Sequence, residues 1–289
     1  MKAPVYLNQA VVKDWLPARP EEGHKGTFGK VDIVAGSEGY TGAPVLAARA
    51  AVRGGTGLVF LQVPRSVYPI IAVKCDEAMP SPLPDQGGKV SGDALAPILE
   101  RAESCDAVLI GPGLGRSEDS DRLVREAAER LEKPLVLDAD GLNAVSGHIT
   151  ILRGRKSPTV LTPHDGEFAR LTGHWPGENR QAEALALAEQ TGAVVVLKGH
   201  RTVIAEPGGS LCVNTTGNAG MAKGGSGDVL AGLTVSLLAQ GMDAFHAAAA
   251  AVWVHGRAGD LCRDELGQRA MTPGDLIARF GAVLKPLED

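Results

Sequence analysis

Cysteine and aromatic residues are scarce in this chain of 289 residues, which contains four cysteines and only 4% aromatic residues. The cysteines lie far apart, at positions 75, 105, 212 and 262, and form no CxxC pair. This spacing argues against a disulfide framework or a zinc site and indicates free thiols in a reducing compartment. The shortage of aromatic side chains argues against an aromatic binding surface.

Long apolar runs and an excess of basic charge are also missing. No uninterrupted apolar run reaches the ~20 residues that a membrane span needs, and the richest, residues 247–254, is mostly alanine. The first residues do not combine a basic region with an apolar stretch, as a secretory signal would. The net charge of −5 argues against a nucleic-acid partner, because a phosphate backbone requires a basic face. We therefore expect a cytoplasmic protein with no membrane and no nucleic-acid partner.

Glycine, by contrast, is abundant, and its 37 residues cluster after short β-branched runs. Strands are expected at residues 31–35, 57–63, 107–110, 135–138, 160–161 and 194–197, with a helix over residues 43–53 after the first. This alternation predicts an α/β fold whose largely parallel sheet is covered on both faces. Because polar glycine-rich segments follow the strands, we expect the ligand at the carboxyl edge of the sheet.

The Pro- and Gly-rich segments 79–97 and 173–180 are interpreted as excursions over the surface. Neither is long enough for an interdomain linker, and the chain has no internal repeat. We therefore expect residues 1–289 to form a single domain.

The most informative motif is NAGMAKGGSGD, residues 218–228, followed by VLAGLTVSLLAQG with helical periodicity and a stop at Gly241. Its glycines precede a helix, where free N–H groups and the helix dipole attract an anion. Glycine also lets the backbone approach a phosphate closely. The motif is not a Walker A loop, because no Lys-Ser/Thr follows the last glycine. The expected phosphate-binding residues are Gly224, Gly225, Ser226 and Gly227.

Asp228 ends this motif and has two interpretations. As the helix N-cap it would accept a backbone hydrogen bond, worth about 1 kcal/mol. As a general base it would take a proton from a substrate hydroxyl beside a bound phosphoryl group. The spacing alone leaves both open.

A second segment, VVVLKGHRT, ends a predicted strand at Lys198. Lys198 could place its ammonium group against a nucleotide phosphate, or it could be a solvated lysine at a strand–turn boundary. The GGSGD motif about thirty residues downstream favours the first interpretation.

Several motifs occur together in one order: GSEGYTGAPVLAARAAVRGGTGLV, GPGLG, LDADGLN, LTPHDGEFARL, VVLKGHRT and NAGMAKGGSGDVLAG. Together they resemble the ADP/ATP-dependent NAD(P)H-hydrate dehydratases, a branch of the ribokinase-like superfamily. The resemblance runs from about residue 26 to about residue 279. It implies a ribokinase-like, three-layer α/β/α fold with a largely parallel central sheet, and a nucleotide bound at the GGSGD helix.

The resemblance also implies a reaction. The C6 hydroxyl of hydrated NADH or NADPH (NADHX or NADPHX) is phosphorylated and the phosphate is then eliminated, because phosphate is a far better leaving group than hydroxide. ADP or ATP is the phosphate donor and Mg2+ the cofactor. ADP is favoured, which would give AMP and phosphate.

Site residues carry over from this resemblance by motif. Asp228 would be the catalytic base, and Glu167 would organise Mg2+ through water, as suits a hard cation. The adenine nucleotide would be bound by Lys198, Gly199, His200, Arg201 and Thr202 together with the glycine-rich loop. The dinucleotide substrate would be bound by Ala43, Gly113, Gly115, His164 and Asp228.

Simpler structural roles remain open for several of these residues. Ala43 could serve helix packing alone, and His164 could be a turn residue making one hydrogen bond. Asp138 and Asp140, with Asn143 nearby, could cap the next turn or face the phosphates. His255, in the alanine-rich stretch, reads as a packed or capping histidine.

Two other functions remain as alternatives. One is a ribokinase-like small-molecule kinase of the hydroxymethylpyrimidine or hydroxyethylthiazole type, and the other is a non-catalytic nucleotide-binding protein. A Rossmann-type dehydrogenase is disfavoured, because no GxGxxG motif has the required context. Only about 25 residues precede the first motif, so we expect no fused epimerase domain and a separate NAD(P)HX epimerase as functional partner. The resemblance further implies a homo-oligomer, a tetramer.

Overall fold

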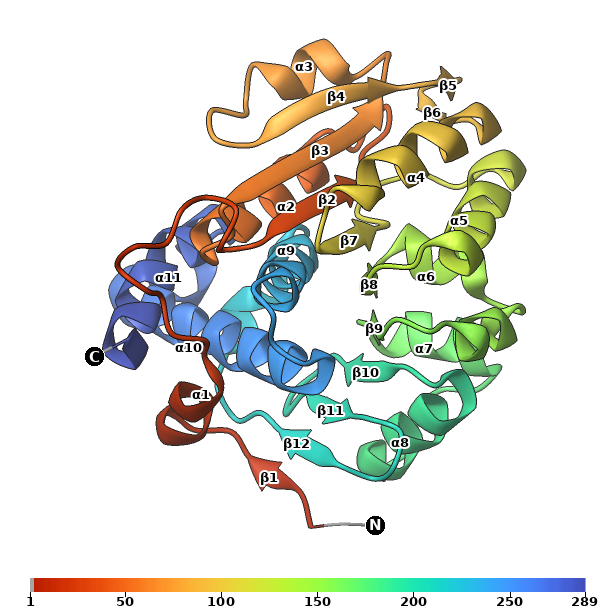
Figure 1. The fold of residues 1–289 in the computed structure, drawn as a ribbon. Coiled ribbons are helices and arrows are strands. Elements are labelled where there is room, and N and C mark those ends of the chain that lie inside the picture. Colours follow the sequence, from red (N-terminus) through yellow and green to blue (C-terminus); the bar gives the residue numbers. More distant parts are fainter. Residues whose placement is uncertain (1–2, 289) are drawn as a thin grey trace.

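The computed structural model describes residues 3–288. One ten-stranded sheet curves through the molecule with helices on both faces (Figure 1). Its first seven strands are parallel neighbours in the spatial order β4 (Met79–Leu83), β3 (Leu58–Pro64), β2 (Lys30–Val34), β7 (Ala107–Ile110), β8 (Leu135–Leu137), β9 (Thr159–Leu161) and β10 (Val194–Leu197). The strands predicted from the sequence are confirmed to within a residue or so at most ends.

Beyond β10 the strands are no longer all parallel. The hairpin of β11 (Val203–Ala205) and β12 (Leu211–Val213) is antiparallel, and β1 (Val5–Tyr6) pairs parallel with β12. In chain order, strands are added on one side from β2 out to β4 and on the other side from β7 out to β10. The switch point therefore lies between β2 and β7, where an open α/β sheet forms its ligand crevice.

Two helical layers cover the sheet (Figure 1). One contains α1 (Gln9–Trp15), α2 (Gly42–Arg53), α9 (Ser226–Ala239), α10 (Ala244–Ala270) and α11 (Pro273–Glu288). The other contains α4 (Leu95–Glu103), α5 (Glu118–Arg130), α6 (Asp140–Val145), α7 (Asp165–Thr172) and α8 (Arg180–Thr191). Side chains alternate along each strand, so Ile33 joins the core under the first layer and Val34 the core under the second. The three-layer α/β/α prediction is confirmed.

Short elements connect these layers. They are α3 (Tyr68–Ala72), the two-stranded ribbon β5 (Asp85–Gln86) and β6 (Lys89–Val90), and the 3-10 turns η1 (Gly92–Ala94), η2 (Ile149–Gly154) and η3 (Ala219–Met221). None of the helices in residues 3–288 is long and apolar enough to cross a bilayer. Each cysteine is a free thiol, as the spacing indicated.

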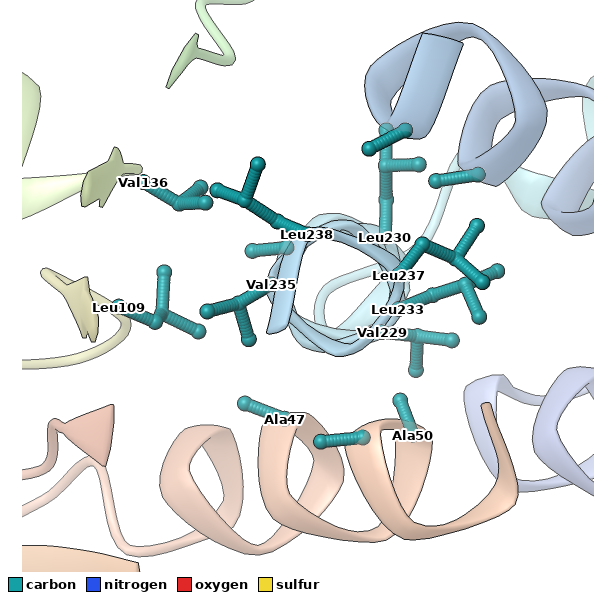
Figure 2. Packing of buried hydrophobic residues seen from close by; sticks show 14 of the residues in the cluster. Ala47, Ala50, Leu109, Val136, Val229, Leu230, Leu233, Val235, Leu237 and Leu238 are labelled. Atoms are coloured by element: carbon teal, nitrogen blue, oxygen red, sulfur yellow. The ribbon is translucent and has the colours of Figure 1, made fainter. Parts of the chain in front are cut away.

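Helix α9 lies inside the fold and packs on two sides. Figure 2 shows Val235 and Leu238 toward Leu109 and Val136 of the sheet, with Val229 facing helix α2 on the other side. A Cβ on Gly232 would lie 2.1 Å from the carbonyl oxygen of Ala47, so glycine permits this close approach to α2. The packing fixes where the amino end of α9, and with it the GGSGD motif, lies.

The prediction that residues 79–97 form a surface excursion is wrong for much of the segment. Met79–Leu83 is the edge strand β4, and α4 begins at Leu95. Pro80 and Pro82 are tolerated because β4 pairs only with β3. The Leu83 carbonyl points toward β3. Backbone polar groups of successive residues in a strand point to opposite sides, so Pro80 and Pro82 place their nitrogens at the open edge of the sheet. Residues 173–179 contain no helix or strand and are mostly exposed, as predicted.

Candidate active site

A buried ion cluster joins the carboxyl ends of three neighbouring strands. Lys198 follows β10, and its Nζ lies 3.0 Å from Oδ1 of Asp138, which follows β8, and 3.6 Å from Oε2 of Glu167. Thr162, after β9, donates its hydroxyl to the same Asp138 oxygen at 2.7 Å. Burial alone would lower the pKa of Lys198, but the two carboxylates outweigh it and the pKa is raised. The interpretation of Lys198 as a solvated surface lysine is therefore wrong.

The first turn of α9 faces this cluster. The glycines at the start of α9 differ in whether the fold requires a residue without a Cβ. Gly225 has φ +99°, and a Cβ there would lie 2.7 Å from Leu46 Cδ1, so the fold itself demands glycine. A Cβ on Gly224 would meet nothing within 4 Å, and one on Gly227 would lie 3.5 Å from Lys198 Nζ, an ordinary contact. Folding therefore does not require glycine at 224 or 227. The open space above them fits a phosphate held by free N–H groups.

Asp228 is the third residue of α9, and its N-cap interpretation is wrong. Gly225, in the left-handed conformation, occupies the N-cap, and no side chain caps this helix end. Burial and, after it, the charge of Asp138 raise the pKa of Asp228 to about 6, although the charge of Lys198 lowers it. Within residues 3–288 the carboxylate has charged neighbours but no hydrogen-bond donor of its own. It is free to accept a proton from a ligand.

The predicted substrate-binding residues near the amino end of the chain meet at the switch point. Ala43 lies in the first turn of α2. Gly113 has φ +61°, and a Cβ there would lie 3.0 Å from the Ala43 Cβ, so the two motifs touch. The backbone N–H of Gly115 donates to Oδ2 of Asp140 at 2.9 Å, and Ser37 Oγ donates to the Gly113 carbonyl at 2.8 Å. These bonds fix the GPGLG loop beside the amino end of α2.

His164 and Glu167 form a reciprocal cap at the start of α7. The His164 Nδ1 accepts from the backbone N–H groups of Gly166 and Glu167, and the Glu167 Oε2 accepts from the His164 N–H at 2.8 Å. His164 is thus a helix cap, with more bonds than the single one considered from the sequence, and its side chain stays half exposed. Whether it also contacts substrate remains a prediction.

The segment after Lys198 forms a tight exposed turn. The Gly199 N–H lies 3.4 Å from Thr202 Oγ1, which donates back to the Gly199 carbonyl at 3.0 Å, while His200 and Arg201 are exposed. Arg180 supports this turn from below by donating to the Lys198 carbonyl at 2.8 Å and to Asp165 Oδ1 at 2.7 Å. Sequence reasoning missed Arg180, because a single arginine after an irregular segment carries no signal of this contact.

Asp140 and Asn143 have internal partners. Asp140 holds Gly115, and Asn143 donates its amide to Asp140 Oδ1 at 3.2 Å while accepting from Arg170 Nε at 2.6 Å. These bonds favour the turn-capping interpretation for both. Ala139, between Asp138 and Asp140, has φ +50°, a strained conformation for a residue with a Cβ, of the kind that concentrates at functional sites.

The acidic groups outnumber the basic ones here but form no ready-made metal cage. Among residues 3–288, no three His, Cys, Asp or Glu side chains are grouped to hold a metal ion. Both Glu167 oxygens face protein partners, so an inner-sphere bond from Glu167 would break existing contacts. Mg2+ usually keeps several waters and uses one or two carboxylates with substrate phosphates, which suits this arrangement.

A hollow of about 620 Å³ lies at the opposite, amino edge of the sheet, away from all these groups. It is lined by residues that begin β9 and β10 and by the end of α9, and it includes none of the predicted site residues. The convergence of charged side chains, free helix N–H groups and the strand switch point therefore identifies the site better than volume does.

The largely parallel sheet between two helical layers matches a ribokinase-like α/β fold. A ribokinase-like superfamily protein from Enterococcus faecalis matches over 99% of this chain and 97% of its own, with TM-score 0.85 and 26% identity. Residues 31–280 match a family model described as NAD(P)H-hydrate dehydratase. The chain belongs to the NAD(P)H-hydrate dehydratase family.

Three further comparisons agree with this assignment. The chain is 46% identical to the bifunctional NAD(P)H-hydrate repair enzyme Nnr of Moorella thermoacetica over 98% of this chain and 54% of that protein. It is 40% identical to the ADP-dependent (S)-NAD(P)H-hydrate dehydratase of Neisseria meningitidis, over 86% of this chain and 82% of the relative. The Bacillus subtilis ADP/ATP-dependent dehydratase, crystallised with ATP/Mg2+, covers 99% of both chains with TM-score 0.84 and 32% identity. The chain spans about half the length of the bifunctional relatives.

Proposed function

We propose that this protein dehydrates (6S)-hydrated NADH and NADPH, using ADP or ATP as phosphate donor, and so repairs damaged nicotinamide nucleotides. ADP is the preferred donor in this proposal, because the Neisseria relative is named for it. The products are NAD(P)H, inorganic phosphate and the shortened nucleotide, AMP when ADP is used.

One observation carries the proposal: the carboxylate of Asp228 lies in the first turn of α9, at a helix end that no side chain caps. Asp228 has a pKa raised to about 6, so it is ionised at neutral pH yet remains a usable base. Gly224 and Gly227 precede it, and a Cβ would meet nothing within 4 Å at Gly224 and only ordinary contacts at Gly227. Lys198 lies 3.5 Å from the Cβ position of Gly227 and supplies positive charge toward the same space.

The chemistry follows from these positions. The N–H groups of the α9 first turn hold the terminal phosphate, and Asp228 takes the proton from the C6 hydroxyl of the hydrated ring. The hydroxyl oxygen then bonds to phosphorus, and the bond from phosphorus to the shortened nucleotide breaks. Phosphate leaves C6 as the ring-nitrogen lone pair forms a double bond, and loss of a proton from the adjacent ring carbon restores the dihydropyridine.

The same residues account for the expected Mg2+. Asp228, Asp138, Asp140 and Glu167 outnumber the single ammonium group of Lys198 around the phosphate space. In this proposal Glu167 would organise the ion only through water, because its oxygens already have partners. When bound, the ion would neutralise charge on the nucleotide phosphates.

The deciding experiment follows the reduced-nicotinamide absorbance band with hydrated NADH or NADPH, Mg2+ and either ADP or ATP. A nucleotide-dependent rise with stoichiometric phosphate release supports the proposal and identifies the donor. Nucleotide consumption with a hydroxymethyl heterocycle instead would make the protein a small-molecule kinase. Nucleotide binding without any turnover would leave the non-catalytic interpretation.

The remaining expectations extend this proposal to the whole protein. We propose one domain over residues 1–289, a cytoplasmic location and pairing with a separate NAD(P)HX epimerase. We also propose a homo-oligomer, a tetramer. Ile70 in α3, Val73 at its end and Met79 in β4 are exposed apolar residues, at 49%, 82% and 39% exposure, which supports association on this part of the surface. Light scattering at several protein concentrations tests the oligomer.

A further inference from the structure

Lys198 is held at its ammonium group, at its backbone N–H and at its carbonyl. Its Nζ lies 3.0 Å from Asp138 Oδ1 and 3.6 Å from Glu167 Oε2. Its N–H donates to the Pro163 carbonyl at 2.8 Å, and its own carbonyl accepts from Arg180 Nη2 at 2.8 Å. Arg180 is the one of these partners that comes from α8. The backbone that carries Lys198 is therefore fixed from outside the ion cluster as well as from within it.

Arg180 bridges two elements of the site. Its Nη1 donates to Asp165 Oδ1 at 2.7 Å, while its Nη2 donates to the Lys198 carbonyl. Asp165 is the first residue of α7, the helix that brings Glu167 to the ion cluster. One guanidinium group thus sets the position of the start of α7 relative to the end of β10.

The surrounding structure leaves this guanidinium little freedom. Arg180 is the first residue of α8, whose N-cap Asn179 accepts from the Ala182 N–H at 3.1 Å. A Cβ on Gly199 would lie 2.8 Å from Arg180 Nη2 and 3.3 Å from its Cζ, so the group packs directly against the backbone after Lys198. Its Nε is buried with no hydrogen-bond partner in residues 3–288, so the two terminal nitrogens alone make the bridge. A planar guanidinium reaches two acceptors at a fixed spacing, which a lysine cannot do.

The bridge matters because of where the ammonium group of Lys198 lies. Its Nζ is 3.5 Å from the Cβ position of Gly227, in the first turn of α9. The attraction between an ammonium group and a phosphate falls with distance, so a small shift of the Lys198 backbone weakens it. Without Arg180 the Lys198 carbonyl and the start of α7 would be free to separate.

We propose that Arg180 is a positioning residue that acts on the terminal nucleotide phosphate through Lys198. It holds the end of β10 against α7, and this keeps the Lys198 ammonium group at the amino end of α9. The inference rests on the proposed function, since it takes the anion at α9 to be a nucleotide phosphate.

The test measures nucleotide binding to the full chain by titration calorimetry with ADP–Mg2+ and with AMP. Arg180→Met removes both donors, whereas Arg180→Lys keeps the charge but not the two-point bridge. Arg279→Met is the matched control, because Arg279 pairs with Glu265 at similar exposure but joins α11 to α10. Circular dichroism and melting temperature show whether each variant folds.

Arg180→Met is expected to weaken ADP–Mg2+ binding about tenfold, the typical effect of losing a charge-assisted hydrogen bond. AMP binding should change much less, because AMP lacks the phosphate that Lys198 contacts in this proposal. Arg180→Lys should lie between wild type and Arg180→Met, and Arg279→Met should bind both nucleotides as wild type does.

A double-mutant cycle with Lys198→Met shows whether Arg180 acts through Lys198. In the Lys198→Met background, Arg180→Met should cause no further loss of ADP–Mg2+ affinity; if that background does not fold, the comparison of ADP with AMP decides. Additive losses, equal losses for ADP and AMP, or unchanged ADP affinity in Arg180→Met would overturn the inference and leave the proposed function intact. A wild-type protein that binds ADP–Mg2+ without dehydrating hydrated NADH would overturn the proposed function instead, while the Arg180 comparison would stand.

Discussion

At the scale of single residues, Asp228 is defined by its surroundings rather than by its type. Three other carboxylates raise its pKa and one lysine lowers it, and burial is the largest cause of the shift to about 6. Placement in the first turn of α9, one turn from the N-cap, leaves its oxygens free. A cap residue would have satisfied itself on the helix and would have been unable to take a substrate proton.

Replacement of Asp228 separates its chemistry from its effect on stability. Asp228→Ala should abolish turnover while nucleotide affinity stays within a few-fold, and wild-type kcat/KM should rise as pH increases through about 6 because only the ionised form is a base. Steady-state rates across pH check this. A flat profile between pH 5 and 7, or full activity in Asp228→Ala, would contradict the assignment.

The contribution of Asp228 to the stability of the protein has the opposite pH dependence. The folded-state pKa is raised above the ordinary value of 3.8, so between about pH 4 and 6 the folded protein holds a proton that the unfolded chain has released. Asp228 therefore lowers stability as pH rises through that window. Asp228→Asn should melt at a higher temperature than wild type at pH 8 and at the same temperature at pH 4.

Gly224 provides a test of whether a ligand fills the space above the loop. Because nothing lies within 4 Å of a Cβ there, Gly224→Ala should leave the melting temperature of the free protein unchanged. The methyl group would, however, block close approach of a phosphate and weaken ADP–Mg2+ binding by tenfold or more. Gly154→Ala, at an equally open position far along the chain, is the control and should change neither quantity. Unaltered affinity in Gly224→Ala would place the phosphate elsewhere.

At the scale of elements, buried charge inside a strand creates a second pH effect. Asp32, in the middle of β2, is fully buried and accepts one hydrogen bond, from Gln62 Nε2 at 2.7 Å, while its Oδ1 has no partner. Burial raises its pKa to about 7, against the hydrogen bond from Gln62 and the charge of Arg101, which lower it. The strand therefore carries a carboxyl group that resists ionisation.

Asp32→Asn should remove that penalty. Between about pH 4 and 7 the folded protein retains a proton that the unfolded chain loses, so wild-type stability falls as pH rises across this window. The asparagine variant should lack this fall and be more stable at pH 8, by at most about 4 kcal/mol for a shift of this size. Urea unfolding at pH 5 and pH 8 measures it. Equal stability of the two proteins at pH 8 would show that Asp32 ionises without cost.

The α2–α9 contact is the element interface on which the site most depends. Gly232→Ala would place a methyl group 2.1 Å from the Ala47 carbonyl, so the two helices must separate. Overpacking of this kind costs about 1–3 kcal/mol. Because the same helix pair also brings Leu46 of α2 close to Gly225 at the start of α9, nucleotide affinity should fall as well. Gly281→Ala, in α11 with nothing within 4 Å, should be neutral or stabilising; a harmless Gly232→Ala would refute the close packing.

The sequence predicts those features that are local. Glycines before a periodic stretch predicted where α9 begins, and β-branched runs predicted the parallel strands. The pairing of Lys198 with Asp138 spans 60 residues and depends on the spatial order of β8, β9 and β10, which no local pattern encodes. The β4 strand was missed because its prolines disfavour a strand unless it lies at an edge. His255, which the alanine-rich stretch indicated to be a packed or capping histidine, is buried in α10.

At the scale of the whole molecule, the site connects the two halves of the sheet on either side of the switch point between β2 and β7. Ala43 and the GPGLG loop lie at the switch between β2 and β7, whereas Lys198 lies at the end of β10. Helix α9 connects them, since its first turn approaches Leu46 of α2 on one side and Lys198 on the other. A ligand that spans the crevice would therefore contact both halves of the sheet through one helix.

Ligand binding should consequently raise the stability of the whole protein. Free ADP–Mg2+ at 100 times its dissociation constant stabilises the folded state by about 2.7 kcal/mol, which corresponds to a rise of roughly 5 °C in melting temperature for a chain of this size. Asp228→Ala should show the same rise, because binding does not need the base, and Gly224→Ala should show much less. Scanning calorimetry with ADP–Mg2+, with ATP–Mg2+ and with Mg2+ alone measures these shifts. A wild-type melting temperature that neither nucleotide changes would contradict a nucleotide site at α9 altogether.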